Sequence, residues 1–181
     1  MQIIDPSDYK VFQSLAYATN DNFTSKKIYK REVSFLHPNA AEALSRAVTI
    51  AASLSLKFRI YDAFRPVEAQ KLMWSHTPNP SYITDPKKGS PHSRGIAIDL
   101  TLCKLDGQNL EMGSKFDSFT EKSHHGYLNI TKEEQINRNL LLGIMTASGW
   151  DFYVNEWWHY QLFDTKSYPL LSDKAAGTNL I

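Results

Sequence analysis

Three stretches of the chain carry hydrophobic patterns regular enough to predict secondary structure. Residues 39–54 are rich in Ala and Leu at helical spacing, and Asn39 begins a capping-box pattern, so we expect a helix here. Residues 57–62 alternate polar and apolar side chains, which indicates a strand with one buried face. Residues 96–102 are apolar and β-branched on both sides of Asp99, which is typical of a buried strand.

Helix-breaking residues divide the region between the two predicted strands. Pro66 is suited to the first turn of a short helix that runs to about Trp74. Residues 76–91 contain four prolines and a glycine, so we expect an irregular loop. This loop leads directly into the second predicted strand.

The remaining pattern predicts a turn, a helix and a last strand. Asp106-Gly107 is a hairpin signal, and Thr131 begins a second capping box, whose helix Gly149 can end. Residues 158–163 are the last strand candidate. Helices flanking a few strands predict an α+β domain spanning residues 1–181, with a small, largely antiparallel sheet.

Composition and charge narrow the classes of partner. The chain of 181 residues is 42% hydrophobic and 22% charged, with a net charge of +1, so we expect neither nucleic acid nor a membrane as a partner. Cys103 is the only cysteine, which excludes an internal disulfide and suits a reducing compartment. Residues 1–6 carry no basic, then apolar, secretory pattern, and we therefore expect a cytoplasmic protein.

His92 and Asp99 form the first pair of candidate metal ligands. A spacing of seven would place both on one helix face, but Pro91, Gly95 and the isoleucines around Ala97 argue against a helix. On one straight strand the odd spacing would turn the side chains to opposite faces. The pair converges only if His92 lies in a turn before the strand, with Gly95 allowing the backbone to bend.

Glu156 and His159 supply a second half of the candidate site. Residues three apart meet on a helical turn or a tight bend but face apart on a strand. Catalytic zinc takes three protein ligands and leaves a fourth position open, and His92, Asp99 and His159 would be such a set. Glu156 would then act as general base towards a water activated by the metal.

Arg65 follows the first predicted strand, within the stretch Tyr61-Asp62-Ala63-Phe64-Arg65-Pro66. Attack of water on a peptide carbonyl creates an oxyanion, and a fixed guanidinium would stabilise the developing negative charge. Arg65 is therefore our candidate for stabilising the transition state.

The two motifs together resemble a known family. The pattern Ser-x-His-x-x-Gly-x-Ala-x-Asp at residues 90–99, followed by Glu-x-Trp-His at 156–159, is similar to the VanX-type D-alanyl-D-alanine dipeptidases. The resemblance runs from about residue 61 to 163 and includes Met-Gly-Ser-Lys-Phe-Asp at 112–117 and Ser-His-His at 123–125. It implies the fold of the hedgehog domain and the DD-peptidases.

The resemblance also implies a role for each matching residue. One Zn²⁺ per chain would be bound by His92, Asp99 and His159, with Glu156 as catalytic base and Arg65 stabilising the transition state. Ser90 and Asp117 would hold the ammonium group of a small dipeptide substrate. The implied reaction is hydrolysis of free D-Ala-D-Ala to two D-alanines.

Two rival functions remain open from the sequence. A D,D- or L,D-carboxypeptidase or endopeptidase acting on peptidoglycan stem peptides would use the same metal site in an open cleft. A non-catalytic zinc-binding module would keep the metal as a structural element. Glu156 and Arg65 beside an open three-ligand site argue against the module, because structural zinc sites are normally closed by four ligands.

Overall fold

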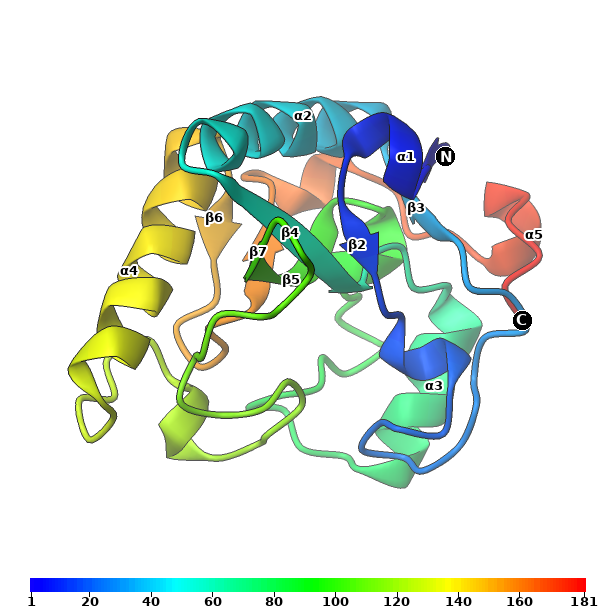
Figure 1. Cartoon of the computed structure of the whole chain (residues 1–181). Helices are drawn as coiled ribbons and strands as arrows, with labels where there is room; N and C mark the ends of the chain where they lie inside the picture. The colour runs from blue at the N-terminus through cyan, green and yellow to red at the C-terminus, as the bar shows by residue number, and fades with distance from the viewer.

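The computed structural model describes all residues, 1–181, and contains five α-helices and seven strands (Figure 1). In chain order these elements are β1 (Gln2–Ile4), α1 (Pro6–Tyr9), β2 (Phe12–Gln13), β3 (Ser34–Leu36), α2 (Pro38–Ser53), β4 (Leu56–Asp62), α3 (Val67–His76), β5 (Ala97–Lys104), α4 (Lys132–Ala147), β6 (Asp151–Phe152), β7 (His159–Gln161) and α5 (Asp173–Ala176).

A five-stranded sheet in the order β2-β4-β5-β7-β6 forms the centre of the molecule. Only the short β2–β4 pair is parallel, and every other pair in this sheet is antiparallel. A separate two-stranded ribbon joins β1 to β3. The α+β class and the small, largely antiparallel sheet are thus confirmed.

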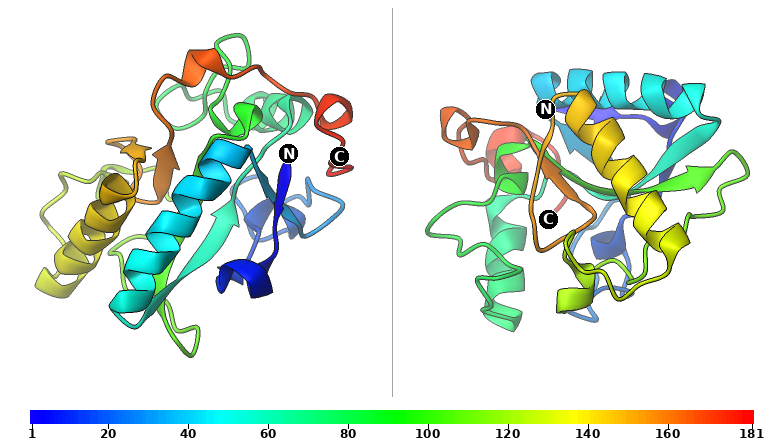
Figure 2. Two further views of the ribbon diagram at one scale, coloured as in Figure 1. Left: turned by 90° about the horizontal axis from the view of Figure 1, so that it is seen from above. Right: turned by 90° about the vertical axis from the view of Figure 1, so that its left-hand side faces the viewer.

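One face of the sheet is covered by α2 and α4, which lie side by side across it (Figure 2). On β5, Ile98, Leu100 and Leu102 point into this layer and are fully buried. They belong to one contiguous apolar cluster that also includes the alanine face of α2. Loops and α3 lie on the opposite side of the sheet from α2 (Figure 1). The candidate site residues line a cavity together with residues of these loops.

The helix ends agree only in part with the sequence. Thr131 forms the predicted capping box with Glu134, and α4 ends before Gly149, whose φ of 92° suits a glycine. Asn39 does not cap α2, because the helix begins at Pro38 and the His37 side chain accepts from the Asn39 N–H. None of the helices is both long enough and apolar enough to cross a bilayer.

Candidate active site and metal centre

The sheet register brings three site residues into line. His159 at the start of β7 is paired with Asp99 on β5, and Asp62 on β4 is paired with Asp99 from the other side. A bulge between Ile60 and Asp62 makes this possible, because regular alternation would have turned Asp62 towards the helices. The three side chains therefore meet on the loop-covered face.

His92 reaches the same face from a turn of 3-10 helix, His92–Arg94, as the sequence predicted. Gly95 ends this turn with a φ of 70°, a conformation in which other residues are strained. A side chain at this position would also collide with the thioether of Met1. The Arg65 N–H donates to the His92 carbonyl at 3.1 Å, which fixes the turn against the end of β4.

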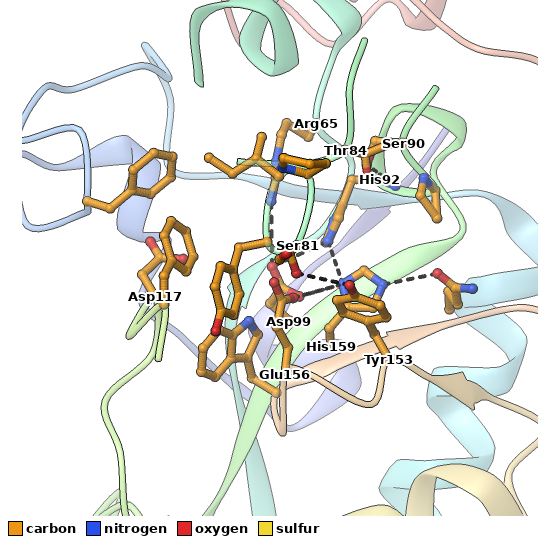
Figure 3. A pocket seen from close by; sticks show the side chains of 18 of the residues that line it. Arg65, Ser81, Thr84, Ser90, His92, Asp99, Asp117, Tyr153, Glu156 and His159 are labelled. Atoms are coloured by element: carbon orange, nitrogen blue, oxygen red, sulfur yellow. Dashed lines mark hydrogen bonds and ion pairs between the residues drawn. The ribbon is translucent and has the colours of Figure 1, made fainter. Parts of the chain in front are cut away.

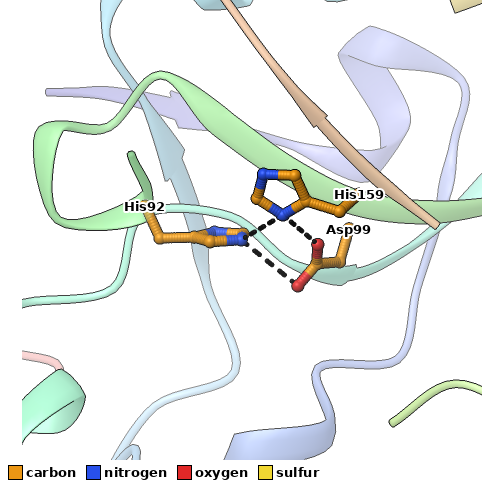
Figure 4. Close-up of side chains that lie close together, drawn as sticks. All are labelled: His92, Asp99 and His159. Atoms are coloured by element: carbon orange, nitrogen blue, oxygen red, sulfur yellow. Dashed lines mark hydrogen bonds and ion pairs between the residues drawn. The ribbon is translucent and has the colours of Figure 1, made fainter. Parts of the chain in front are cut away.

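The polar atoms of His92, Asp99 and His159 converge on one point (Figure 4). His92 Nε2 lies 3.1 Å from His159 Nδ1 and 3.3 Å from Asp99 Oδ2. His159 Nδ1 lies 3.1 Å from Asp99 Oδ1. All three side chains are almost completely buried. We refer to these three residues as the triad.

Hydrogen bonds behind the triad set the tautomer of each imidazole. His92 Nδ1 donates to the Ala63 carbonyl at 2.7 Å, so Nε2 carries the lone pair. His159 Nε2 lies 3.2 Å from Gln161 Oε1, which accepts from it and leaves the lone pair on Nδ1. Two neutral rings thus direct lone pairs at each other, an arrangement that a cation between them would stabilise.

The donor set and its spacing fit zinc. Bonds of about 2.0–2.1 Å in a tetrahedron put neighbouring ligand atoms roughly 3.3 Å apart, close to the 3.1–3.3 Å separations within the triad. Burial disfavours ionisation of Asp99, but the contributions of His92 and His159 together outweigh burial and lower the pKa of this carboxyl. Asp99 is therefore ionised and could serve as an oxygen ligand of a metal. Three side chains of these types are a common catalytic zinc set.

Arg65 is held beside the triad by a buried ion pair. Its Nε and one terminal nitrogen each lie 2.8 Å from Asp62 Oδ2, and the latter nitrogen lies 3.6 Å from Asp99 Oδ2. Burial disfavours the charge, but Asp62, with smaller contributions from Tyr17, Tyr29 and Asp99, outweighs burial and raises the pKa of Arg65. Tyr29 donates to the other Asp62 oxygen at 2.9 Å and so completes the anchoring of this carboxylate.

Glu156 lies on the tight turn that precedes β7, where the spacing to His159 predicted a bend. The His159 N–H donates to the Glu156 carbonyl at 3.2 Å, and Glu156 Oε2 lies 3.9 Å from His159 Nδ1. Burial, together with the negative charges of Asp99 and Asp117, raises the pKa of Glu156 well above its ordinary value. A carboxyl with a raised pKa takes up a proton more readily than an ordinary glutamate.

Asp117 occupies a different part of the cavity wall from Ser90 (Figure 3). Its carboxylate accepts from the Tyr17 hydroxyl at 3.1 Å. Burial and the negative charge of Asp99 raise the pKa of Asp117 to about 8. Ser90 lies beside His92 and accepts from the His92 N–H at 3.2 Å. The two residues that the resemblance assigned jointly to a substrate ammonium thus do not lie together.

All the candidate residues line one cavity of about 290 Å³ (Figure 3). Trp158 forms part of its wall, while Tyr17 and Phe23, from the N-terminal region, close one side. The cavity is just below the roughly 300–1,000 Å³ of pockets that hold drug-sized ligands, which suits a ligand no larger than a short peptide.

Several residues that support the site were not identified from the sequence. Asp62 lies three positions before Arg65, and Gln161 lies two after His159 on the same strand face, so both had a local signal. The aromatic residues near the N-terminus, Tyr17 among them, were expected to close one end of the cleft, but no motif indicated the contact of Tyr17 with Asp117 or that of Tyr29 with Asp62.

Comparison with known proteins identifies the family of this chain. A family model described as D-Ala-D-Ala dipeptidase, of the M15 peptidases, matches residues 7–175. The Escherichia coli K12 protein named D-alanyl-D-alanine dipeptidase is 44% identical over 160 residues, or 88% of this chain and 83% of that one. The Enterococcus faecium protein of the same name is 39% identical, over 84% of this chain and 86% of that one.

More distant matches extend the comparison. A Streptomyces coelicolor D-alanyl-D-alanine dipeptidase is 35% identical, over 81% of this chain and 83% of that one. Among solved structures, the Serratia marcescens L-Ala D-Glu endopeptidase ChiX aligns with a TM-score of 0.47 at 11% identity, over 90% of this chain and 98% of that one. The family match and the curated relatives lead to one conclusion: this chain is a peptidase of the D-Ala-D-Ala dipeptidase family of M15 metallopeptidases.

Proposed function

We propose that this chain hydrolyses the free dipeptide D-Ala-D-Ala to two D-alanines with one zinc ion bound by His92, Asp99 and His159. The observation that carries the proposal is the triad itself. Its two imidazoles have fixed tautomers and direct lone pairs towards the Asp99 carboxylate at zinc-like spacing, in a chain whose relatives carry the name of this activity. When bound, zinc supplies Lewis acidity, which lowers the pKa of a water ligand and polarises a carbonyl.

Glu156 is the general base in this proposal. Its carboxylate faces the triad, and its raised pKa allows it to take a proton from the attacking water and deliver it to the leaving amine. Arg65 places a permanent positive charge against the same space, where the carbonyl oxygen becomes negative. Proton transfer and charge stabilisation are thereby assigned to two side chains on different segments.

Asp117 and Ser90 hold the two ends of the dipeptide. We assign the substrate ammonium to Asp117. Ionisation of this carboxyl is disfavoured in the cavity, and a bound ammonium would supply the positive charge that stabilises its ionised form. Ser90 lies on the other side of the triad, and its hydroxyl hydrogen can be donated to the substrate because its oxygen already accepts from His92. A peptide blocked or extended at its amine would leave Asp117 without a cationic partner.

Removal and return of the metal tests the proposal. Purified protein should release D-alanine from D-Ala-D-Ala, lose this activity on chelation, and regain it when one equivalent of zinc is added. The metal content should be measured in the same samples. Full activity in protein that holds less than a tenth of an equivalent of metal, by the same measurement, would contradict the zinc proposal.

The rival peptidase function uses the same triad on longer substrates. A D,D- or L,D-carboxypeptidase or an endopeptidase needs room for a peptide on one side of the metal, whereas this cavity has a volume of only about 290 Å³. The small volume of the cavity therefore supports the dipeptidase. The non-catalytic module would keep zinc but use neither Glu156 nor Arg65, both of which are buried against the triad.

A further inference from the structure

Residues 79–88 form a wall of the cavity that the proposed chemistry does not use. We call them the wall segment. Ser81, Thr84 and Lys88 of this segment all line the cavity. The segment is a series of turns: the Ile83 N–H, for example, donates to the Asn79 carbonyl at 2.8 Å. Such a folded loop can move as a unit unless other parts of the chain hold it.

Gln70 holds the wall segment from α3. Its side-chain Nε2 donates to the Thr84 carbonyl at 2.7 Å. Only 2% of Gln70 is exposed, although it is a polar residue on a helix with an exposed face. On the other side of the segment, the Tyr153 hydroxyl donates to the Ser81 carbonyl at 2.9 Å. A third contact, between the Tyr82 hydroxyl and His124 Nε2 at 3.3 Å, also ties the wall to the rest of the chain.

The same Gln70 side chain also supports Arg65. Its Oε1 accepts from the Arg65 terminal nitrogen Nη1 at 3.0 Å. Asp62 contacts only Nε and the other terminal nitrogen, Nη2, of Arg65. Gln70 therefore provides the hydrogen-bond partner for the remaining nitrogen, Nη1. A glutamine can serve both partners, because its amide has a donor at one end and an acceptor at the other.

We propose that Gln70 is a positioning residue that couples the wall segment to the Arg65 guanidinium, so that one side chain both encloses the short peptide and sets the group that stabilises the oxyanion. Displacement of the wall would cost the Thr84 contact and shift the amide that supports Arg65. Correct enclosure of a substrate would conversely hold the guanidinium in place. The identity of the enclosed peptide rests on the proposed function, whereas the coupling itself does not.

Two variants separate the contact of Gln70 with the wall segment from its contact with Arg65. Gln70→Glu keeps an acceptor for Arg65 but has no donor for the Thr84 carbonyl. Gln70→Met removes both contacts at similar volume. Leu72→Gln, two residues further along the same helix on its exposed side, is the matched control.

Hydrogen exchange tests the contact between Gln70 and the wall segment, and it does not depend on turnover. In both Gln70 variants the wall-segment amides, such as those of Tyr82 and Ile83, should exchange about 5- to 10-fold faster, which is the effect of losing one hydrogen bond. Leu72→Gln should exchange like the wild type. Unchanged exchange in both Gln70 variants would overturn the tie to the wall. This measurement decides the tie even if the wild type fails to cleave D-Ala-D-Ala.

Steady-state kinetics tests the support that Gln70 gives to Arg65. Both Gln70 variants should raise KM for the dipeptide, because each loosens the wall. Gln70→Met should also lower kcat about 10-fold, while Gln70→Glu should keep kcat within about threefold of the wild type, since the support of Arg65 remains. An equal loss of kcat in both variants, or no loss in Gln70→Met, would overturn the coupling to Arg65.

Discussion

The two faces of β5 are equally buried but differ in what buries them. Ile98, Leu100 and Leu102 face the helices and belong to the contiguous apolar cluster. Asp99, on the other face, is buried to the same extent but among two histidines and Arg65. Apolar burial stabilises the fold, whereas buried charge is costly unless it is paired. The helix-covered face therefore stabilises the fold. The loop-covered face buries charged groups at a cost in folding free energy, and the proposed chemistry explains why they are there.

The sharpest test of this contrast is Glu156→Gln, which should produce the largest effect. The rate should fall about 10³-fold, because the amide cannot accept the proton. Unfolding of the metal-free variant should occur at the same or a higher temperature, since a buried carboxyl with a raised pKa has been removed. Rates and melting curves on one preparation provide both readouts. A large loss of stability would mean that Glu156 holds the loop-covered face together.

Zinc removal should have the next largest effect. At a free zinc concentration a thousand times Kd, the metal should stabilise the fold by about 4 kcal/mol, because it binds only the folded triad. Titration of chelated protein with zinc, followed by thermal unfolding, measures this gain. His159→Ala should abolish the gain. A protein whose melting temperature is unaffected by zinc would contradict the assignment of the triad.

On the helix-covered face, Leu100→Ala should lower stability and leave catalysis unchanged, which is the reverse of the expected effect of Glu156→Gln. The cavity it leaves should lower the free energy of unfolding by about 3 kcal/mol. The fraction that remains folded should keep the wild-type kcat, because Leu100 points away from the triad. Denaturant unfolding and single-temperature kinetics check the two parts. A kcat lowered with the stability would show that the two faces are not separable.

A smaller, pH-dependent effect should come from Asp117. Its pKa is raised to about 8 in the fold, above the ordinary unfolded value, so the protonated form is favoured by folding. That stabilisation is full below the unfolded pKa, about 4, and is lost as the pH rises towards about 8. In chelated protein, melting temperatures between these values should therefore fall with pH more steeply than in Asp117→Asn. Parallel profiles would contradict the raised pKa.

The same contrast explains what the sequence could reveal. The apolar patterns predicted α2 and β5 well, because they directly record the helix-covered face, and α4 was predicted from its capping box and terminal glycine. The shorter strands β1, β2, β3 and β6 have two or three residues each and leave no usable period. The last strand is also shorter than predicted, because Trp158 still belongs to the turn that presents His159.

On the loop-covered face, the site residues that belong to a motif could be predicted from the sequence, whereas those that reach the site only through tertiary contacts could not. His92, Asp99 and His159 come together as the spacing argument required, with His92 in a turn before the strand. The bulge that turns Asp62 towards the site, and the Gln70 amide that joins Arg65 to the wall segment, depend on tertiary contacts. Local sequence carries no signal for the bulge or for the two contacts of Gln70, although the spacing of Asp62 and Arg65 is compatible with their ion pair.

The most direct test of the proposed function is the rate of D-alanine release by the wild-type zinc protein from three substrates side by side. These are D-Ala-D-Ala, its N-acetyl form, and a stem pentapeptide ending in D-Ala-D-Ala. We expect cleavage of the free dipeptide, with the two others at least about 10²-fold slower, because Asp117 would lose its cationic partner. Comparable cleavage of the blocked or longer peptide would contradict the enclosed site and assign the chain to the carboxypeptidases. No cleavage of any substrate, with zinc bound, would contradict the proposed activity itself.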